Sequence, residues 1–146
     1  MKKIIVCVGS VWMENDLAGQ KVYEHFQTLA LPPDIEVYQG GLAGLNLLPL
    51  LEHGGRVVFV DSVKGFASPR EVVIMDREQI VKKRGQHYGH QAGLPYLLAV
   101  LPLVNPGTMP HEIVLVGIEG PVSREAIEKA ARLSLQIATG GLLSPE

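Results

Sequence analysis

The chain has 146 residues, of which 47% are hydrophobic and 19% charged, a size and composition that indicate one compact domain spanning residues 1–146. Its 13 basic and 15 acidic residues leave a net charge of -2, and the basic run at residues 82–84 is too short to follow a phosphate backbone, so nucleic acid is not an expected partner. No stretch has the length of a membrane span, and the single cysteine, Cys7, allows no disulfide framework, so we expect a cytoplasmic protein.

Strand-like runs alternate with helix-like segments along the chain. The strand-like runs are rich in valine and isoleucine and are apolar without alternation, which is typical of strands buried on both faces. The segments between them carry apolar residues at helical spacing. The expected strands are residues 3–8, 34–39, 56–61, 71–75 and 112–117. The helical signals are a stripe at Ala18, Val22, Phe26 and Leu29, a short segment at 45–51, a stripe at Leu94, Leu97, Leu98 and Leu101, and Ser123 as the cap of a helix with Ile127, Ala130 and Ala131.

This alternation predicts an α/β fold. We expect a three-layer, doubly wound, mostly parallel five-stranded sheet with helices on both faces, which is phosphorylase/hydrolase-like with a flavodoxin-like strand order. The fourth strand follows the third without an intervening helix. An antiparallel pairing of that strand therefore stays open.

Three polar residues are candidates for a site at the sheet edge. In an open sheet of this kind, ligands bind beyond the carboxyl ends of the strands, where the strand order reverses. The first strand leads into a long loop that contains Asp16, and the third is expected to end directly in Asp61. Pro95 favours a helix that begins shortly before it, which places His90 at the start of that helix. The two carboxylates and the imidazole are therefore expected to converge.

The chemistry of this trio has more than one interpretation. Two carboxylates and one imidazole suit a divalent ion such as zinc or nickel, with open positions left for other ligands. The same groups could form an acid/base site, and their spacing in the sequence does not separate the two. Asp16 would also serve as an ordinary helix cap, and Cys7, inside an apolar strand, is expected to be a buried, inert thiol.

Several motifs follow the predicted strands in order. Gly9, Ser10, Asn15, Asp16 and Gly19 follow the first, a glycine-rich turn at 39–48 follows the second, Asp61 ends the third, His90 to Leu94 read HQAGL, and residues 113–120 read IVLVGIEG before the last helix. In these motifs, and over nearly its full length, the chain resembles the maturation endopeptidases of nickel-iron hydrogenases. It is similar to them as a divergent member, since Ser10, Asn15, Gln39 and Leu42 depart from the family pattern.

The resemblance implies an aspartyl-type or metal-dependent endopeptidase that removes a C-terminal extension from a nickel-iron hydrogenase large-subunit precursor once nickel has been inserted. In that family the positions of Asp16, Asp61 and His90 bind a metal, so these residues are the expected metal ligands and catalytic residues. The nickel is supplied by the precursor, and zinc or cadmium is expected only as an adventitious ion. Trp12 and Met13, in the same loop as Asp16, would then be offered to this large partner, whereas taken by themselves they could equally fold back onto the core.

Two alternatives from other classes stay open. A non-catalytic metal- or partner-binding module on the same fold would keep the cleft without cutting a substrate. A receiver-like phosphoacceptor domain also carries an aspartate after its third strand. It requires an acidic pair after the first strand and a lysine after the fifth, where this chain has Gly9-Ser10 and Glu119-Gly120.

Overall fold

The computed structural model describes residues 2–9, 17–41, 45–52, 55–82, 87–88, 98, 101–103, 107 and 109–141. The elements in chain order are β1 (Lys3–Val8), α1 (Leu17–Phe26), β2 (Ile35–Gly41), the 3-10 helix η2 (Leu45–Leu51), β3 (Arg56–Lys64), β4 (Val72–Asp76), α2 (Arg77–Lys82), β5 (His87–Tyr88), β6 (Glu112–Glu119) and α4 (Arg124–Gly140). All five strands expected from the apolar runs are present.

The strands form one mixed sheet in the order β2-β1-β3-β6-β4, with β5 paired to β3. The strands β2, β1, β3 and β6 run parallel, and β4 runs antiparallel to β6 at the sheet edge. The mostly parallel sheet with β2-β1-β3 in flavodoxin-like order is thereby confirmed. The fourth strand, β4, is antiparallel, as the short connection from β3 allowed, but it is not a neighbour of β3, because β6 lies between them.

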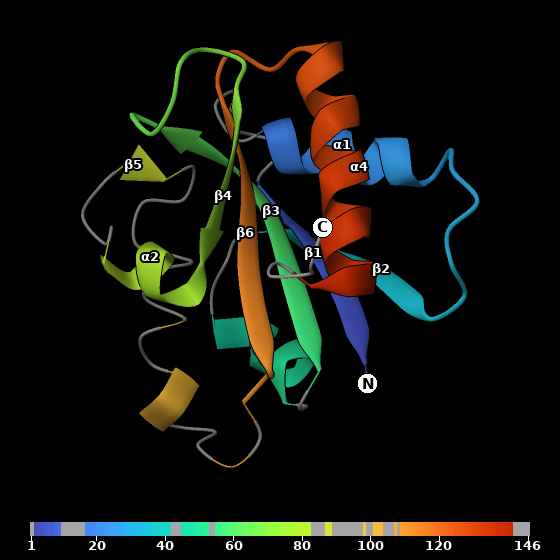
Figure 1. Ribbon diagram of the computed structural model, residues 1–146, viewed down its shortest axis with the longest axis vertical. Coiled ribbons are helices and arrows are strands. Elements are labelled where there is room, and N and C mark those ends of the chain that lie inside the picture. Colours follow the sequence, from blue (N-terminus) through green and yellow to red (C-terminus); the bar gives the residue numbers. More distant parts are fainter. Residues whose placement is uncertain are drawn as a thin grey trace.

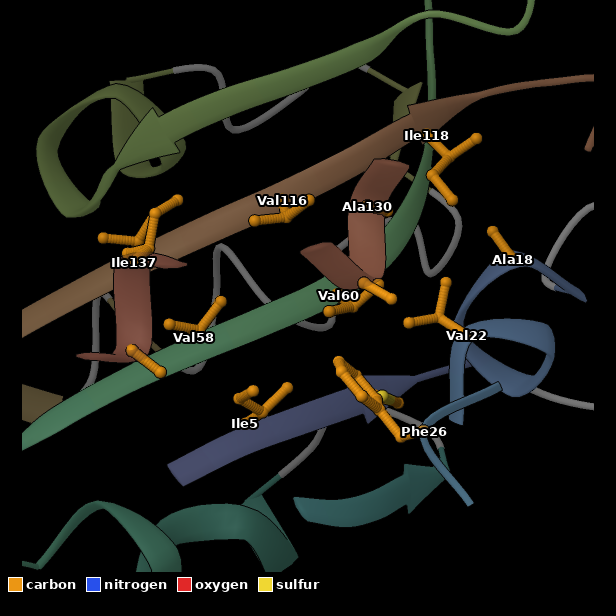
Figure 2. Close-up of a cluster of buried hydrophobic side chains, with 14 of the residues drawn as sticks. Ile5, Ala18, Val22, Phe26, Val58, Val60, Val116, Ile118, Ala130 and Ile137 are labelled. Atoms are coloured by element: carbon orange, nitrogen blue, oxygen red, sulfur yellow. The ribbon is translucent and has the colours of Figure 1, made fainter. Parts of the chain in front are cut away.

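Helices cover both faces of this sheet, as predicted: α1 and α4 lie on one side and α2 on the other (Figure 1). The side chains between the sheet and the pair α1 and α4 form one apolar cluster. Figure 2 shows Val22 and Phe26 of α1 and Ala130 and Ile137 of α4 over the strand residues of this cluster. Those strand residues include Ile5, Val58, Val60, Val116 and Ile118.

A second apolar cluster covers the opposite face. Leu51 of η2, Ile80 of α2, and Leu98 and Leu101 from the segment before β6 are all fully buried, and they pack with strand residues such as Phe59. The predicted stripe at 94–101 is confirmed for its last two leucines, whereas Leu94 and Leu97 lie outside the described residues. The sheet is therefore the middle of three layers.

The sequence predicts the start of α4 correctly but not the end of α1. Ser123 caps α4 as expected, because its hydroxyl accepts a hydrogen bond from the Ala126 amide. The prediction that Leu29 continues the stripe of α1 is wrong, since α1 ends at Phe26 and Leu29 is 39% exposed. The Leu29 amide donates to the carbonyl of Phe26, three residues back, and this tighter turn rotates Leu29 away from the apolar face.

The described part of the chain holds no helix that is both long enough and apolar enough to cross a membrane.

Candidate functional site

Asp61 is a fully buried carboxylate within the central strand β3. Its Oδ1 accepts a hydrogen bond from the Ser62 amide at 2.8 Å, which fixes the orientation of the carboxylate. The prediction that the third strand ends in Asp61 is wrong, because β3 continues to Lys64. The strand is longer because β6 pairs with it as far as Val63 opposite Glu119.

The edge of β3 that faces β1 changes its pairing partner at Asp61. β1 pairs with β3 up to Cys7 opposite Val60, and β5 pairs with it from Val63 opposite Tyr88. β6 pairs with the other edge of β3 as far as Val63. β5 therefore pairs with the same edge of β3 as β1 does, beyond the end of β1 and in the antiparallel direction. Asp61 therefore lies where β1 ends, at the predicted switch point of the sheet, although it does not end its own strand.

The side chain of Asp61 belongs to the face that α2 and η2 cover. Side chains alternate along a strand, and Val57, Phe59 and Val63, which share the parity of Asp61, all lie in the cluster beneath those helices. Gly117 is the partner of Asp61 on β6, and a Cβ there would lie 2.7 Å from Cγ1 of Val63. A glycine at this position therefore leaves room for the packing of Val63 next to Asp61.

The loop that contains Asp16 starts and ends near the same end of the sheet. At its start, the Gly9 amide donates to the Gly41 carbonyl at 2.7 Å, which joins the ends of β1 and β2. At its end, α1 packs so closely on β1 that a Cβ on Gly19 would lie 1.9 Å from the carbonyl oxygen of Val8. Both ends of this loop are thus held at the carboxyl end of β1.

Asp16 and His90 lie outside the described residues, as do Trp12 and Met13. The convergence of Asp16 and His90 with Asp61 therefore stays a prediction. Within the described ranges, no group of three or more histidine, cysteine, aspartate or glutamate side chains is arranged to hold a metal ion.

Cys7 is confirmed as a buried structural thiol. It is 1% exposed, and burial raises the pKa of the thiol from 9.0 to about 12. A thiol with this pKa is protonated at neutral pH and is a poor nucleophile. The cysteine is therefore not a candidate catalytic group.

Glu119 is a buried acidic residue that was not predicted from the sequence to have a special role. This last residue of β6 is 8% exposed, and its carboxylate accepts hydrogen bonds from the amides of Gly65, Phe66 and Ala67. The available signal was an acidic residue directly after a fully apolar strand run. An acidic residue is buried only when its carboxylate has hydrogen-bond donors, and the donors to Glu119 lie far away in the sequence, at residues 65–67.

These features define a three-layer α/β protein with a buried aspartate at the switch point of its sheet. A family model described as HycI, hydrogenase maturation protease, matches residues 20–138. The chain belongs to the hydrogenase maturation protease family.

Individual relatives agree with this assignment. The chain is 28% identical over 125 residues to the hydrogenase expression/formation protein HupD of Rhodobacter capsulatus, an alignment that covers 84% of this chain and 58% of that protein. It is 25% identical over 121 residues to the hydrogenase 2 maturation protease of Escherichia coli K12, covering 81% of this chain and 73% of that protein. The chain thus spans little more than half the length of the first relative.

Solved structures support the same fold. The hydrogenase maturating endopeptidase HybD of E. coli superposes with a TM-score of 0.80 at 22% identity, covering 95% of this chain and 93% of that one. The [NiFe] hydrogenase maturation protease HycI of Thermococcus kodakarensis superposes with a TM-score of 0.65 at 23% identity, covering 94% and 91%.

Proposed function

We propose that this chain is an endopeptidase that removes the C-terminal extension of a nickel-iron hydrogenase large-subunit precursor after nickel insertion. Membership of the hydrogenase maturation protease family supports the type of reaction and the type of partner. The names of the two relatives refer to hydrogenase formation and hydrogenase maturation. We also propose that residues 1–146 act as one domain and that processing takes place in the cytoplasm.

The pairing of β5 with β3 carries the proposal for the site. Tyr88 lies opposite Val63, and His87 lies opposite Lys64 in an antiparallel register. If that register is continued by two residues, His90 falls opposite Asp61. Directly opposed residues of an antiparallel pair have Cβ atoms about 5 Å apart, close enough for both side chains to bind one ion. This pairing supports Asp61 and His90 as two ligands of the same metal.

We propose Asp16 as the third ligand. It immediately precedes Leu17, the first residue of α1, and α1 is held against the end of β1 by the close approach of Gly19 to Val8. The end of β1 lies beside Asp61 on the neighbouring strand. A short reach from the start of α1 would therefore bring a second carboxylate to the proposed ion.

The chemistry of these three side chains fits a borderline divalent ion. Carboxylate oxygen and imidazole nitrogen are donors that nickel and zinc accept, and three protein ligands leave positions open for a substrate. The bond from the Ser62 amide to Asp61 Oδ1 holds the carboxylate in one orientation before any ion arrives. When bound, a divalent ion supplies Lewis acidity that can polarise a peptide carbonyl or activate a water molecule.

Nickel is part of the substrate in this proposal. The precursor brings the ion with some of its ligands, and Asp16, Asp61 and His90 complete the coordination. The isolated chain would then hold nickel weakly, because three ligands from one chain do not close a site. Zinc or cadmium would be an adventitious occupant.

Incubation with the nickel-loaded large-subunit precursor tests the proposal, with the mass of the large subunit as the measurement. We expect the mass to fall by that of the C-terminal extension, and the nickel-free precursor to stay intact. Asp61→Asn should abolish processing. The matched control is Asp76→Asn, because Asp76 also accepts a main-chain bond, from the Gln79 amide at 2.9 Å, but lies at the end of β4.

The outcomes separate the alternatives. Cleavage by the Asp76→Asn protein and none by the Asp61→Asn protein supports the peptidase. A wild-type protein that binds the nickel-loaded precursor and leaves its mass unchanged is a non-catalytic binding module, and the peptidase proposal fails.

A further inference from the structure

Glu119 connects the last strand of the sheet to the loop that follows β3. This residue is 8% exposed, and its side chain accepts three main-chain hydrogen bonds. Oε2 accepts from the amide of Gly65 at 2.9 Å, and Oε1 accepts from those of Phe66 at 2.9 Å and Ala67 at 3.0 Å. One buried carboxylate thus satisfies three successive amides at the end of β3.

The main chain of Glu119 holds the other end of the same loop. Its amide donates to the Glu71 carbonyl at 2.9 Å, and its carbonyl accepts from the Arg70 amide at 2.9 Å. The loop from 65 to 71 contains two positive φ angles, 87° at Gly65 and 70° at Arg70, and the second is unfavourable for a residue with a side chain. The bonds to Glu119 therefore fix a loop conformation that the chain does not favour by itself.

The position of Glu119 in the sheet links this loop to the proposed metal site. Glu119 lies opposite Val63 on β3, and Val63 lies opposite Tyr88 of β5. The three residues form one row across the sheet, and Asp61 lies two residues before that row on β3. An end of β3 that moved would shift β5, and with it the pairing on which the proposed position of His90 opposite Asp61 rests.

We propose that Glu119 is a positioning residue of the metal site, which holds the end of β3 so that β5 keeps its register. This inference rests on the proposed function, since the positioned pair is Asp61 and His90. The carboxylate of Glu119 is suited to this role because both of its oxygens accept hydrogen bonds from amides. A glutamine has one accepting oxygen, and its NH₂ group would face an amide donor.

Cadmium binding by isothermal titration calorimetry, with the ion alone as the probe, tests the role of Glu119. We expect Glu119→Gln to bind cadmium about 10- to 100-fold more weakly than the wild-type protein, as is typical when a residue supporting a metal ligand is changed. Amide hydrogen exchange at residues 65–67 should become faster in the same variant, which shows that the three bonds are lost.

The matched control is Glu112→Gln at the other end of the same strand. Glu112 is also a partly buried carboxylate, and its Oε1 accepts from Arg56 Nε at 2.7 Å. It lies opposite Arg56, five residues before Asp61 along β3. Glu112→Gln should lower the melting temperature and leave the cadmium affinity unchanged.

Unchanged cadmium affinity in Glu119→Gln, together with faster exchange at 65–67, would overturn the inference, because Glu119 would then stabilise the loop alone. If Glu119→Gln does not fold, Glu119→Asp serves instead, since it keeps the carboxylate on a shorter side chain. A wild-type cadmium affinity of the Glu119→Asp variant would also overturn the inference. If the Asp61→Asn variant instead bound cadmium with the affinity of the wild-type protein, the proposed site itself would be refuted.

Discussion

Replacing Asp61 by asparagine separates the stability of the fold from the proposed chemistry of the site. The Ser62 amide donates to Asp61 Oδ1 at 2.8 Å, and asparagine offers an accepting oxygen of the same reach in nearly the same volume. We therefore expect the free energy of unfolding in metal-free buffer to change by no more than about 1 kcal/mol. Asp61→Ala should cost about 1–3 kcal/mol, because it leaves the amide of the buried Ser62 without this acceptor.

The metal-dependent part of the stability should behave differently. An ion present at 100 times its dissociation constant stabilises the protein that binds it by about 2.7 kcal/mol, which raises the melting temperature by about 5–10 °C for a domain of this size. Thermal unfolding with and without cadmium should show this rise for the wild-type protein. Asp61→Asn removes the negative charge from a proposed metal ligand, so the cadmium-induced rise in melting temperature should be largely lost in this variant.

Two results would refute this reasoning. One is an Asp61→Asn protein that cleaves the nickel-loaded precursor at the wild-type rate. The other is a cadmium-induced rise in melting temperature that is equal in Asp61→Asn and in the wild-type protein, since a buried carboxylate with a purely structural role would give that result.

Three further substitutions or measurements test the packing. Gly19→Ala should lower the free energy of unfolding in urea by about 3 kcal/mol or more, because its Cβ would lie 1.9 Å from the Val8 carbonyl oxygen. Gly107→Ala should change the same free energy by less than about 1 kcal/mol, because among the described residues no atom outside its chain neighbours lies within 4 Å of the added Cβ. Ser134→Ala should raise it by about 0.5–1 kcal/mol, since the Ser134 hydroxyl is buried in α4 without a hydrogen-bond partner among the described residues; a loss would show that this hydroxyl has one. Cys7 should react with a thiol reagent only after unfolding. Burial raises the pKa of the Cys7 thiol from 9.0 to about 12, so the stability contributed by the buried, protonated thiol is present below pH 9 and is lost as the pH rises from 9 to about 12. Rapid labelling of the native protein would contradict the burial of Cys7.

The main strands could be predicted from the sequence because burial on both faces leaves a direct mark on composition. A run such as residues 56–60 has no polar side chain after Arg56, and only a central strand of a layered sheet accommodates it. The switch-point rule then selected Asp61, and the structure places this residue beside the end of β1.

The features that the sequence did not reveal depend on partners far away in the chain. β3 extends past Asp61 because β6 and β5 pair with its last residues, and β5 has two residues with no apolar pattern. Glu119 is buried because three amides more than fifty residues away donate to it. Local periodicity carries no information about such pairings.

The position of β6 between β3 and β4 has a consequence for the order of folding. Among the strands that the structure describes, β6 is the last to be synthesised, yet it pairs with the strand that holds Asp61 from Arg56 to Val63. Until residues 112–119 have been synthesised, β3 has an open edge and Asp61 has no completed sheet around it. Contacts over such a long stretch of chain form slowly, so a truncated or incompletely folded chain should have no assembled site. The surroundings of Asp61 would therefore be assembled only after residues 112–119 have been synthesised.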